Sequence, residues 1–296
     1  MIQEGHPVIN MGIGSPDLAP HPEVINALSK AMEHPRVNMY QSYQGLPELR
    51  SAIANFYQKH YQVNLDFNAE VLPLMGSKEG ILHLSMAFLN PGDKVLIPNP
   101  GYPTYESVTR LVEAVPVFYD LKPENNWEPD LAELDKMDLE GVKLLWVNYP
   151  HMPTGANAKQ AVFEELINWA RKNNILLVND NPYSFVLTDK PQSVLTTPGA
   201  MDVAMELNSL SKSFNMAGWR VGMLLGNEAN IKAVLKVKSN MDSGMFYGIQ
   251  QGAIAALQAP DSWFEELNKV YDKRRQLIYE LATLLGSEFD TNSSGL

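Results

Sequence analysis

Short apolar runs alternate with amphipathic helical patterns along most of the chain, and this alternation limits the fold more than any other feature. Three such pairs of a run and a helical pattern stand at 71–75 with 77–89, 94–98 with 104–112, and 142–148 with 161–172. Further apolar runs occupy 115–121, 175–180, 203–207 and 221–226. Strands that are apolar throughout, each followed by a helix, indicate a mostly parallel sheet covered on both faces. The sequence therefore predicts an α/β protein with a three-layer α/β/α large domain.

Both ends of the chain depart from this alternation. Helical patterns occupy 22–34 and 46–61 near the start, and 230–240, 246–257 and 261–285 near the end. Pro260 and Asp261 are typical of a helix stop followed by a new start. We therefore expect an N-terminal arm and part of a small domain over residues 1–40, a large domain over 41–260, and a long helix with the truncated start of a small α+β domain over 261–296. Residues 286–296 are expected to enter a strand through a turn.

Composition narrows the classes of function. The chain has 23 lysines and arginines against 34 aspartates and glutamates, a net charge of −11, which disfavours a nucleic-acid or anionic-membrane partner. It has no cysteine, which excludes disulfides and thiolate metal sites and fits a reducing compartment. No apolar run is long enough to span a bilayer, and residues 1–10 lack the apolar core of a signal peptide. We expect a cytoplasmic protein that acts on small molecules.

Two motifs follow predicted strands, where ligands of such sheets bind. Gly76, Ser77 and Lys78 lie between a strand and a helix, where free backbone N–H groups could hold a phosphate. The simpler interpretation of this motif is a helix cap. Asp180 ends another strand, where a carboxylate is either functional or part of a turn.

A third motif combines Ser209, Ser211 and Lys212 with Arg220. A lysine amine with a lowered pKa can form a Schiff base, and an arginine offers two parallel hydrogen bonds to a phosphate. The motif also contains S-x-x-K, but the S-D-N and K-T-G partners of serine-acylating enzymes are missing. The six histidines never stand at metal-ligand spacing, so no metal site is expected.

Taken in order, these motifs resemble those of the fold type I pyridoxal-phosphate enzymes, in the branch of the class I/II aminotransferases. The resemblance covers nearly the whole chain and rests on residues 12–17, 40–50, 76–78, 100–105, 148–155, 180–183 and 209–220. Within the family it is similar to aspartate aminotransferases and to their relatives that use LL-diaminopimelate.

The resemblance implies a role for each site residue. Lys212 would form a Schiff base with pyridoxal 5'-phosphate and, once released, move the substrate α-proton. Asp180 would accept a hydrogen bond from the pyridinium N–H and keep the ring an electron sink. Tyr183 would hydrogen-bond the ring oxygen and Tyr102 would stack on the ring. The phosphate would be bound by the set Gly76, Ser77, Lys78, Ser209, Ser211 and Arg220.

The resemblance also implies a shared site in a homodimer, because Tyr40 would reach the phosphate of the neighbouring subunit. Gly14 would contact the substrate. The family's N-P-T-G turn has Met152 at the position of its asparagine, and a thioether cannot donate a hydrogen bond to the ring oxygen. His151 or Asn148 could replace that donor, and the sequence leaves both open.

A second departure concerns the substrate. The family arginine that binds the α-carboxylate lies beyond a position equivalent to Leu296, and Arg275 is the last arginine here. We expect a fragment of a longer protein rather than a shortened relative. The resemblance favours an aminotransferase that passes the amino group of an acidic, aspartate-like amino acid to 2-oxoglutarate by a ping-pong mechanism. A pyridoxal-phosphate C–S lyase and a catalytically silent relative are the alternatives.

Overall fold

The computed structural model describes residue 5, residues 14–188 and residues 190–295. Most of residues 1–10, on which the expectation about a signal peptide depends, lie outside the described residues. Gly12 and Ile13 of the first family motif also lie outside them. No helix in the described part of the chain is both long and apolar enough to cross a membrane.

The described residues form one seven-stranded sheet with the strand order β1-β7-β6-β5-β4-β2-β3. The strands are β1 (Val71–Leu74), β2 (Lys94–Asn99), β3 (Val115–Asp120), β4 (Val142–Val147), β5 (Leu176–Asp180), β6 (Ala204–Ser209) and β7 (Gly222–Leu225). Strand β7 pairs antiparallel with β1 and with β6, and the other pairs are parallel. The prediction of a mostly parallel α/β fold is therefore confirmed.

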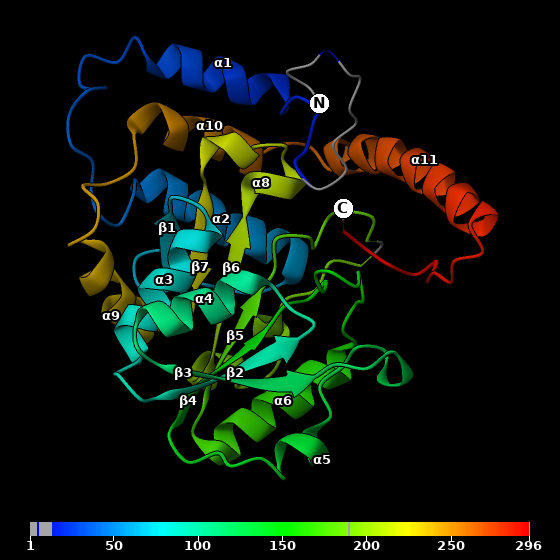
Figure 1. Cartoon of the computed structure of the whole chain (residues 1–296). Helices are drawn as coiled ribbons and strands as arrows, with labels where there is room; N and C mark the ends of the chain where they lie inside the picture. The colour runs from blue at the N-terminus through cyan, green and yellow to red at the C-terminus, as the bar shows by residue number, and fades with distance from the viewer. Residues whose placement is uncertain (1–4, 6–13, 189, 296) are drawn as a thin grey trace.

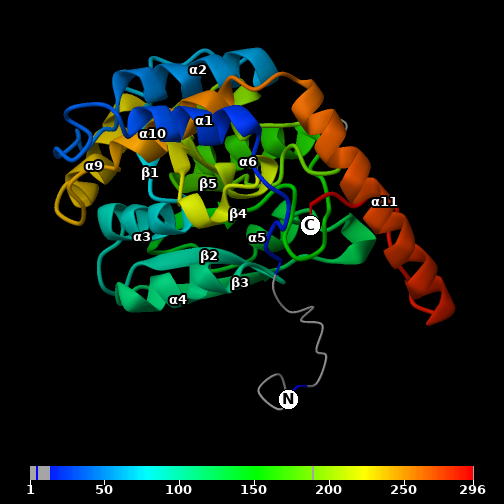
Figure 2. The same cartoon turned by 90° about the horizontal axis from the view of Figure 1, so that it is seen from above.

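Helices cover both faces of this sheet (Figures 1 and 2). They are α1 (Pro22–Ala31), α2 (Pro47–Tyr61), α3 (Ser77–Phe88), α4 (Pro103–Leu111), α5 (Leu131–Leu134), α6 (Gln160–Asn173), α7 (Ala200–Val203), α8 (Leu210–Ser213), α9 (Glu228–Lys238), α10 (Tyr247–Leu257) and α11 (Ser262–Leu284). Helices α2, α6 and α10 contribute to one buried apolar cluster, and α3, α4 and α9 to a second. Helix α1 packs on α10 and adds Val24 to the first cluster. The apolar stripes of these helices thus bury both faces of the sheet.

The topology gathers the candidate residues at one edge. Strand β4 ends one residue before Asn148, β5 ends at Asp180, and β6 leads directly into the short helix α8 that carries Lys212. These three strands are parallel neighbours, with Asp180 paired to Leu207 across β5 and β6. Their carboxyl ends therefore open on the same side, which is where ligands bind in sheets of this kind.

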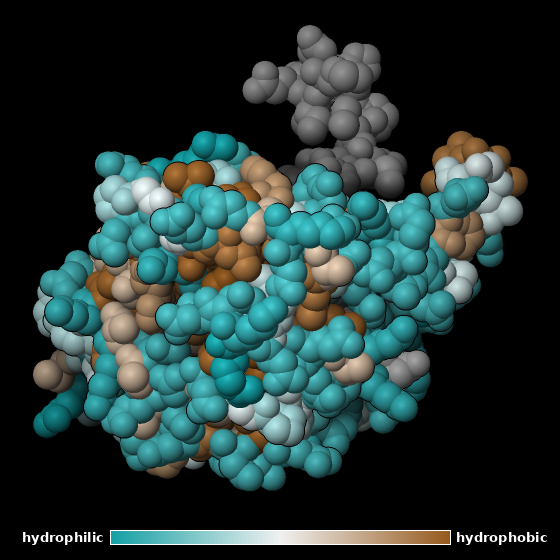
Figure 3. All heavy atoms as spheres, turned by 90° about the horizontal axis from the view of Figure 1, so that it is seen from below, coloured by the Kyte–Doolittle hydropathy of each residue, from teal (hydrophilic) through white to brown (hydrophobic). Residues whose placement is uncertain are grey.

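The last described segment differs from the prediction. Helix α11 is buried at Phe264, Leu267 and Tyr271, whereas its far end projects from the molecule with Leu284 84% exposed (Figures 2 and 3). The expected entry into a strand after residue 286 is wrong for the described residues 286–295, which contain no strand. That segment instead returns toward the sheet, where two loops bind its backbone (Figure 1). The domain limits remain a prediction.

Candidate active site

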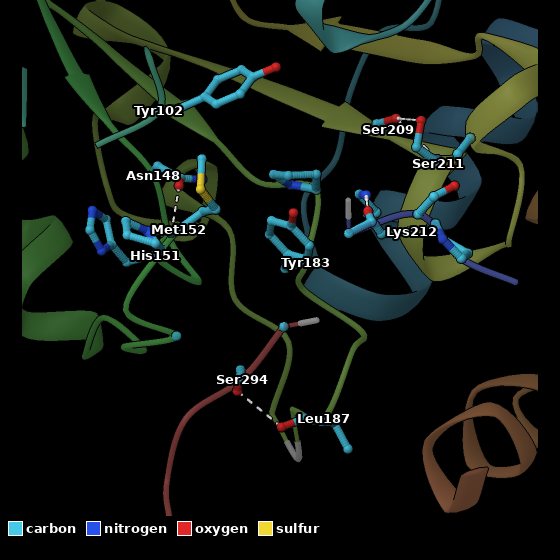
Figure 4. A pocket seen from close by; sticks show the side chains of 18 of the residues that line it. Tyr102, Asn148, His151, Met152, Tyr183, Leu187, Ser209, Ser211, Lys212 and Ser294 are labelled. Atoms are coloured by element: carbon cyan, nitrogen blue, oxygen red, sulfur yellow. Dashed lines mark hydrogen bonds between the residues drawn. The ribbon is translucent and has the colours of Figure 1, made fainter. Parts of the chain in front are cut away.

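A cavity of about 1240 Å³ opens beyond the carboxyl ends of β4, β5 and β6. All the predicted site residues except Gly76 and Tyr40 line it: Gly14, Ser77, Lys78, Tyr102, Asn148, Asp180, Tyr183, Ser209, Ser211, Lys212 and Arg220. Helix α11 and the C-terminal segment complete its wall with Tyr271, Arg274, Arg275 and Ser294. Figure 4 shows Asn148, His151 and Met152 together on one wall, with Lys212, Ser209 and Ser211 on the other and Tyr183 between them.

Lys212 points its amine into this cavity. The Lys212 Nζ donates a hydrogen bond to the carbonyl of Gly14 and lies 5.9 Å from the centre of the Tyr183 ring. Burial lowers the pKa of Lys212, because desolvation disfavours the charged ammonium. A lysine whose pKa is lowered in this way supplies more of the neutral amine, which is the nucleophilic form.

Asp180 is 4% exposed and has one open oxygen, that is, a carboxylate oxygen without a hydrogen-bond partner. The hydroxyl of Tyr105 donates to Asp180 Oδ2 at 3.0 Å, whereas Oδ1 is buried without a hydrogen-bond partner. Burial raises the pKa of Asp180 to about 7, against the opposing effect of the Tyr105 hydrogen bond, and the nearby charge of Glu206 raises it further. A buried carboxylate oxygen without a partner is costly, so this atom fits a cationic N–H donor supplied by a ligand.

The opposite end of the cavity is shaped for an anion. Gly76 precedes helix α3 at φ 91°, and a Cβ there would lie 2.1 Å from Arg220 Nη2. A Cβ on Gly222 would lie 2.6 Å from the backbone nitrogen of Ser77. Both glycines therefore let the Arg220 guanidinium and the N-terminus of α3 approach one another. A helix N-terminus and a guanidinium are two groups that bind phosphate.

Two hydroxyls extend this anion site. Ser209 Oγ donates to Ser211 Oγ at 2.8 Å and accepts the backbone N–H of Ser211 at 3.1 Å. Arg220 is held in a left-handed conformation at φ 57° while its Nη1 donates to the carbonyl of Ala217 at 2.8 Å. The donor set suits a phosphate dianion, and together with the open oxygen of Asp180 it fits pyridoxal 5'-phosphate.

The side chains around Met152 show which residue could donate the hydrogen bond to the ring oxygen that a methionine cannot donate. Both polar atoms of the Asn148 side chain are engaged: Nδ2 donates to the carbonyl of Asp180 at 2.5 Å, and Oδ1 accepts the N–H of Met152 at 2.8 Å. His151 is buried, and its Nδ1 lies 2.8 Å from Thr154 Oγ1. Burial lowers the pKa of His151 to about 4, so the ring is neutral at ordinary pH. The side chain of Asn148 is thus occupied in holding the end of β5 and the backbone of Met152. His151 is the remaining candidate for the hydrogen-bond donor to the ring oxygen.

Several residues at the site were not predicted. Tyr105 donates its hydroxyl hydrogen bond to Asp180, and its ring stacks on Trp146 at 4.8 Å between ring centres. Tyr105 is the last residue of the 100–105 motif, but nothing in that motif marks this tyrosine as a partner of Asp180. Arg274 and Asp17 pair at the mouth of the cavity, and a contact between such distant positions leaves no local signal.

Tyr40 lies away from this cavity. Its side chain is 89% exposed in the single chain, so the predicted contact with a cofactor is not made within one subunit. Away from the cavity, Glu79, His83 and Asp242 offer possible ligand atoms within 4.8 Å of one another. The Lys238 Nζ lies 2.8 Å from Asp242 Oδ2 and already supplies a cation there. The absence of a metal site remains a prediction.

Comparison with known proteins identifies the family to which the chain belongs. The family described as Aminotransferase class I and II matches residues 6–293. The LL-diaminopimelate aminotransferase of Aquifex aeolicus is 41% identical over 289 residues, which cover 97% of this chain and 75% of that protein. The enzyme of the same name from Oleidesulfovibrio alaskensis is 43% identical over 285 residues, covering 95% and 74%.

Solved structures agree with this placement. Substrate-bound BacF from Bacillus subtilis is 38% identical with a TM-score of 0.95, over 99% of this chain and 75% of that one. An aspartate aminotransferase mutant from Thermus thermophilus is 27% identical with a TM-score of 0.92, over 99% and 77%. The chain belongs to the class I and II aminotransferases, a family of enzymes that depend on pyridoxal 5'-phosphate.

Proposed function

We propose that this aminotransferase takes its amino group from LL-diaminopimelate and passes it to a 2-oxo acid, with 2-oxoglutarate as the predicted acceptor. The relatives from Aquifex and Oleidesulfovibrio both carry the name LL-diaminopimelate aminotransferase, which supports this donor over aspartate. A Thermus thermophilus structure titled as a probable N-succinyldiaminopimelate aminotransferase, 34% identical with a TM-score of 0.89, points to related chemistry.

One observation carries the assignment of the chemistry: Lys212 and the open oxygen of Asp180 line the same cavity. When bound, pyridoxal 5'-phosphate supplies an electron sink for the substrate carbanion. Asp180 Oδ1 would accept a hydrogen bond from the ring N–H, and Arg220, Ser209, Ser211 and the N-terminus of α3 would hold the phosphate. Tyr102 would pack on the ring, and Tyr183 would contact its oxygen.

Lys212 is proposed as the proton carrier. As a free amine with a lowered pKa, its Nζ can remove the proton from the α-carbon of the substrate. The carbonyl of Gly14 accepts a hydrogen bond from this nitrogen and would stabilise it while it holds the proton. Helix α11 and the C-terminal residues line the cavity in which this step would occur.

The charges at the cavity mouth support a donor with charged groups at both ends. LL-diaminopimelate carries an ammonium and a carboxylate at each end of its chain. Asp17 and Arg274 form an ion pair at the mouth and present one charge of each sign. A distal ammonium and carboxylate would complement these two side chains, whereas aspartate is too short to bring two such groups there.

We also propose that two chains form a homodimer in which Tyr40 completes the neighbouring site. The side chains of Tyr40 and of its neighbour Met39 are both exposed, at 89% and 59%. Clusters of exposed apolar residues mark interaction surfaces. Residence in the cytoplasm stays a prediction from the sequence.

The test compares amino donors at a fixed concentration of 2-oxoglutarate. We expect kcat/KM for LL-diaminopimelate to exceed that for aspartate by at least about tenfold, because only the longer donor reaches both mouth charges. The oxo-acid product should form in equal amount to glutamate. Equal values for the two donors would contradict the proposed substrate. Release of a thiol and ammonia from a thioether amino acid without glutamate formation would favour the C–S lyase instead.

A further inference from the structure

Glu206 is a buried carboxylate beside the site that the proposed chemistry does not use. It lies on β6 and is 0% exposed. Its Oε1 accepts the Tyr57 hydroxyl at 2.8 Å and the Asn181 amide at 3.3 Å. Its Oε2 accepts the Asn179 amide at 3.0 Å and the backbone N–H of Val194 at 2.9 Å. These partners are neutral groups, and each of them donates.

This arrangement favours the ionised form of Glu206. The Tyr57 hydroxyl accepts a hydrogen bond from the Asn208 amide at 2.9 Å, so its own proton is directed at Glu206. A protonated carboxyl would place an additional hydrogen among these donors without an acceptor for it. Burial raises the pKa of Glu206, whereas the hydrogen bonds that it accepts lower this pKa and so favour the charged form.

Two of the donors flank Asp180 in the chain. Asn179 and Asn181 both direct their amides at Glu206, while Asp180 between them faces the cavity. Alternate residues of an extended chain point to opposite sides, so holding the two asparagines fixes the direction of the residue between them. The backbone N–H of Asn181 also donates to the carbonyl of Leu207 at 2.8 Å.

We propose that Glu206 is a positioning residue for the cofactor: its carboxylate holds Asn179 and Asn181, which orients Asp180, and its charge makes Asp180 a stronger acceptor for the ring N–H. This inference rests on the role that the proposed function gives to Asp180. The negative charge of Glu206 contributes to the raised pKa of Asp180, as a like charge does.

The charge balance of the region agrees with this role. Glu206 is surrounded by neutral donors, and Asp180 has a neutral tyrosine on one oxygen and nothing on the other. Two buried negative charges without a cation are unfavourable. A protonated ring nitrogen at Asp180 Oδ1 would be attracted by both carboxylates, so Glu206 favours the protonated ring without touching it.

The test follows the ring nitrogen itself. Holoenzyme is reconstituted with 15N-labelled pyridoxal 5'-phosphate, and the nitrogen chemical shift is recorded against pH for the wild type, E206Q, E206D and D180N. We expect E206Q, which removes the charge, to lower the midpoint of ring deprotonation by about one pH unit, a tenfold weaker hold on the proton. E206D keeps the charge, so its midpoint should fall by less than that of E206Q. The shorter side chain of E206D cannot accept the hydrogen bonds of both Asn179 and Asn181, so the dissociation constant of this variant for the cofactor should rise severalfold.

The outcomes separate two claims. A midpoint in E206Q that coincides with that of the wild type would overturn the inference about charge, and an unchanged cofactor affinity in E206D would overturn the positioning. If E206Q does not fold by thermal melting, E206D decides the matter, because a cofactor affinity and a midpoint that both equal those of the wild type would overturn the inference. D180N should deprotonate the ring throughout. If D180N leaves the ring titration unchanged, the role of Asp180 in the proposed function fails instead.

Discussion

Arg274 on α11 holds Asp17 with two hydrogen bonds of 2.8 and 3.0 Å, although 257 positions separate the two residues. Asp17 lies three residues after Gly14, whose carbonyl accepts the hydrogen bond of Lys212. The pair therefore connects the long helix to the segment that lies against the Lys212 amine. Arg274 also holds the pKa of Asp17 below its usual range, through this hydrogen bond and its charge.

We expect Arg274→Ala to lower kcat/KM for the amino donor by about tenfold, because the Gly14 segment and the mouth charge are both disturbed. Exposed ion pairs contribute little to stability, so the midpoint of thermal unfolding should change by no more than about two degrees. Arg110→Ala is the matched control, since it removes an exposed pair with Glu106 of 2.9 Å on α4. Equal kinetics in the two variants would contradict the role of the Asp17 pair.

The raised pKa of Asp180 predicts a stability that depends on pH. The folded apo-enzyme retains a proton on Asp180 up to a pKa of about 7, whereas the model value is 3.8. The folded state thus binds more protons between these values, and stability falls as the pH rises through that window. Asp180→Asn should remove this loss and stabilise the apo-enzyme by about 4 kcal/mol at pH 8, with little effect at pH 4.

Urea unfolding of the apo-enzyme at the two pH values measures this difference. Asp120→Asn serves as the control, because Asp120 is an exposed carboxylate at the end of β3. A wild type and an Asp180→Asn variant that stay equally stable at pH 8 would show that Asp180 is not a strained buried acid.

Met152 leads to a spectroscopic prediction. A thioether cannot donate to the ring oxygen of the cofactor, and the loss of a donor disfavours the deprotonated form of a cofactor bound at Lys212. Met152→Asn should therefore lower the pH midpoint of the visible absorbance change by about one unit. Met86→Asn, at an exposed position of α3 outside the cavity, is the control. Identical midpoints in Met152→Asn and the wild type would mean that another donor, such as His151, already serves the oxygen.

The shared site predicts complementation between inactive subunits. Hybrids of Tyr40→Ala and Lys212→Ala chains contain one site in which both residues are native. A dimer with exchanged residues should therefore recover about half of the wild-type activity, although each parent homodimer has little. The measurement is the activity of hybrids purified through two different tags. Inactive hybrids would argue that Tyr40 does not cross to the neighbouring subunit.

The fold was largely predictable because apolar periodicity determined its elements. The expected helix at 161–172 corresponds to α6 (Gln160–Asn173), and the expected strand at 175–180 to β5 (Leu176–Asp180). The antiparallel direction of β7 was not predicted, since an apolar run of four residues carries no direction. The strand entry expected over residues 286–296 was wrong for the described residues 286–295, because a turn-like sequence does not tell whether a neighbouring strand is present to pair with it.

The candidate site was predictable where chemistry follows a strand end, as at Asp180 and Lys212. Family motifs added Tyr102, Tyr183 and Arg220, and the structure places all five around one cavity. Residues that act through long-range contacts were not predictable. Glu206 interrupts the apolar run of β6, and that interruption is a signal of a buried carboxylate. Its partners come from α2, from β5, from the residue after β5 and from the 3-10 helix that begins at Val194, and such distant contacts leave no pattern in the sequence.

The most direct test mixes the holoenzyme with LL-diaminopimelate in the absence of any 2-oxo acid and follows the absorbance of the cofactor. We expect the visible band to disappear in one turnover, one equivalent of oxo-acid product to form, and 2-oxoglutarate to restore the band. In Lys212→Ala the rate of this change should fall by at least about 10³-fold. A visible band that persists in the presence of LL-diaminopimelate, or a Lys212→Ala variant that reacts as fast as the wild type, would contradict the proposed function.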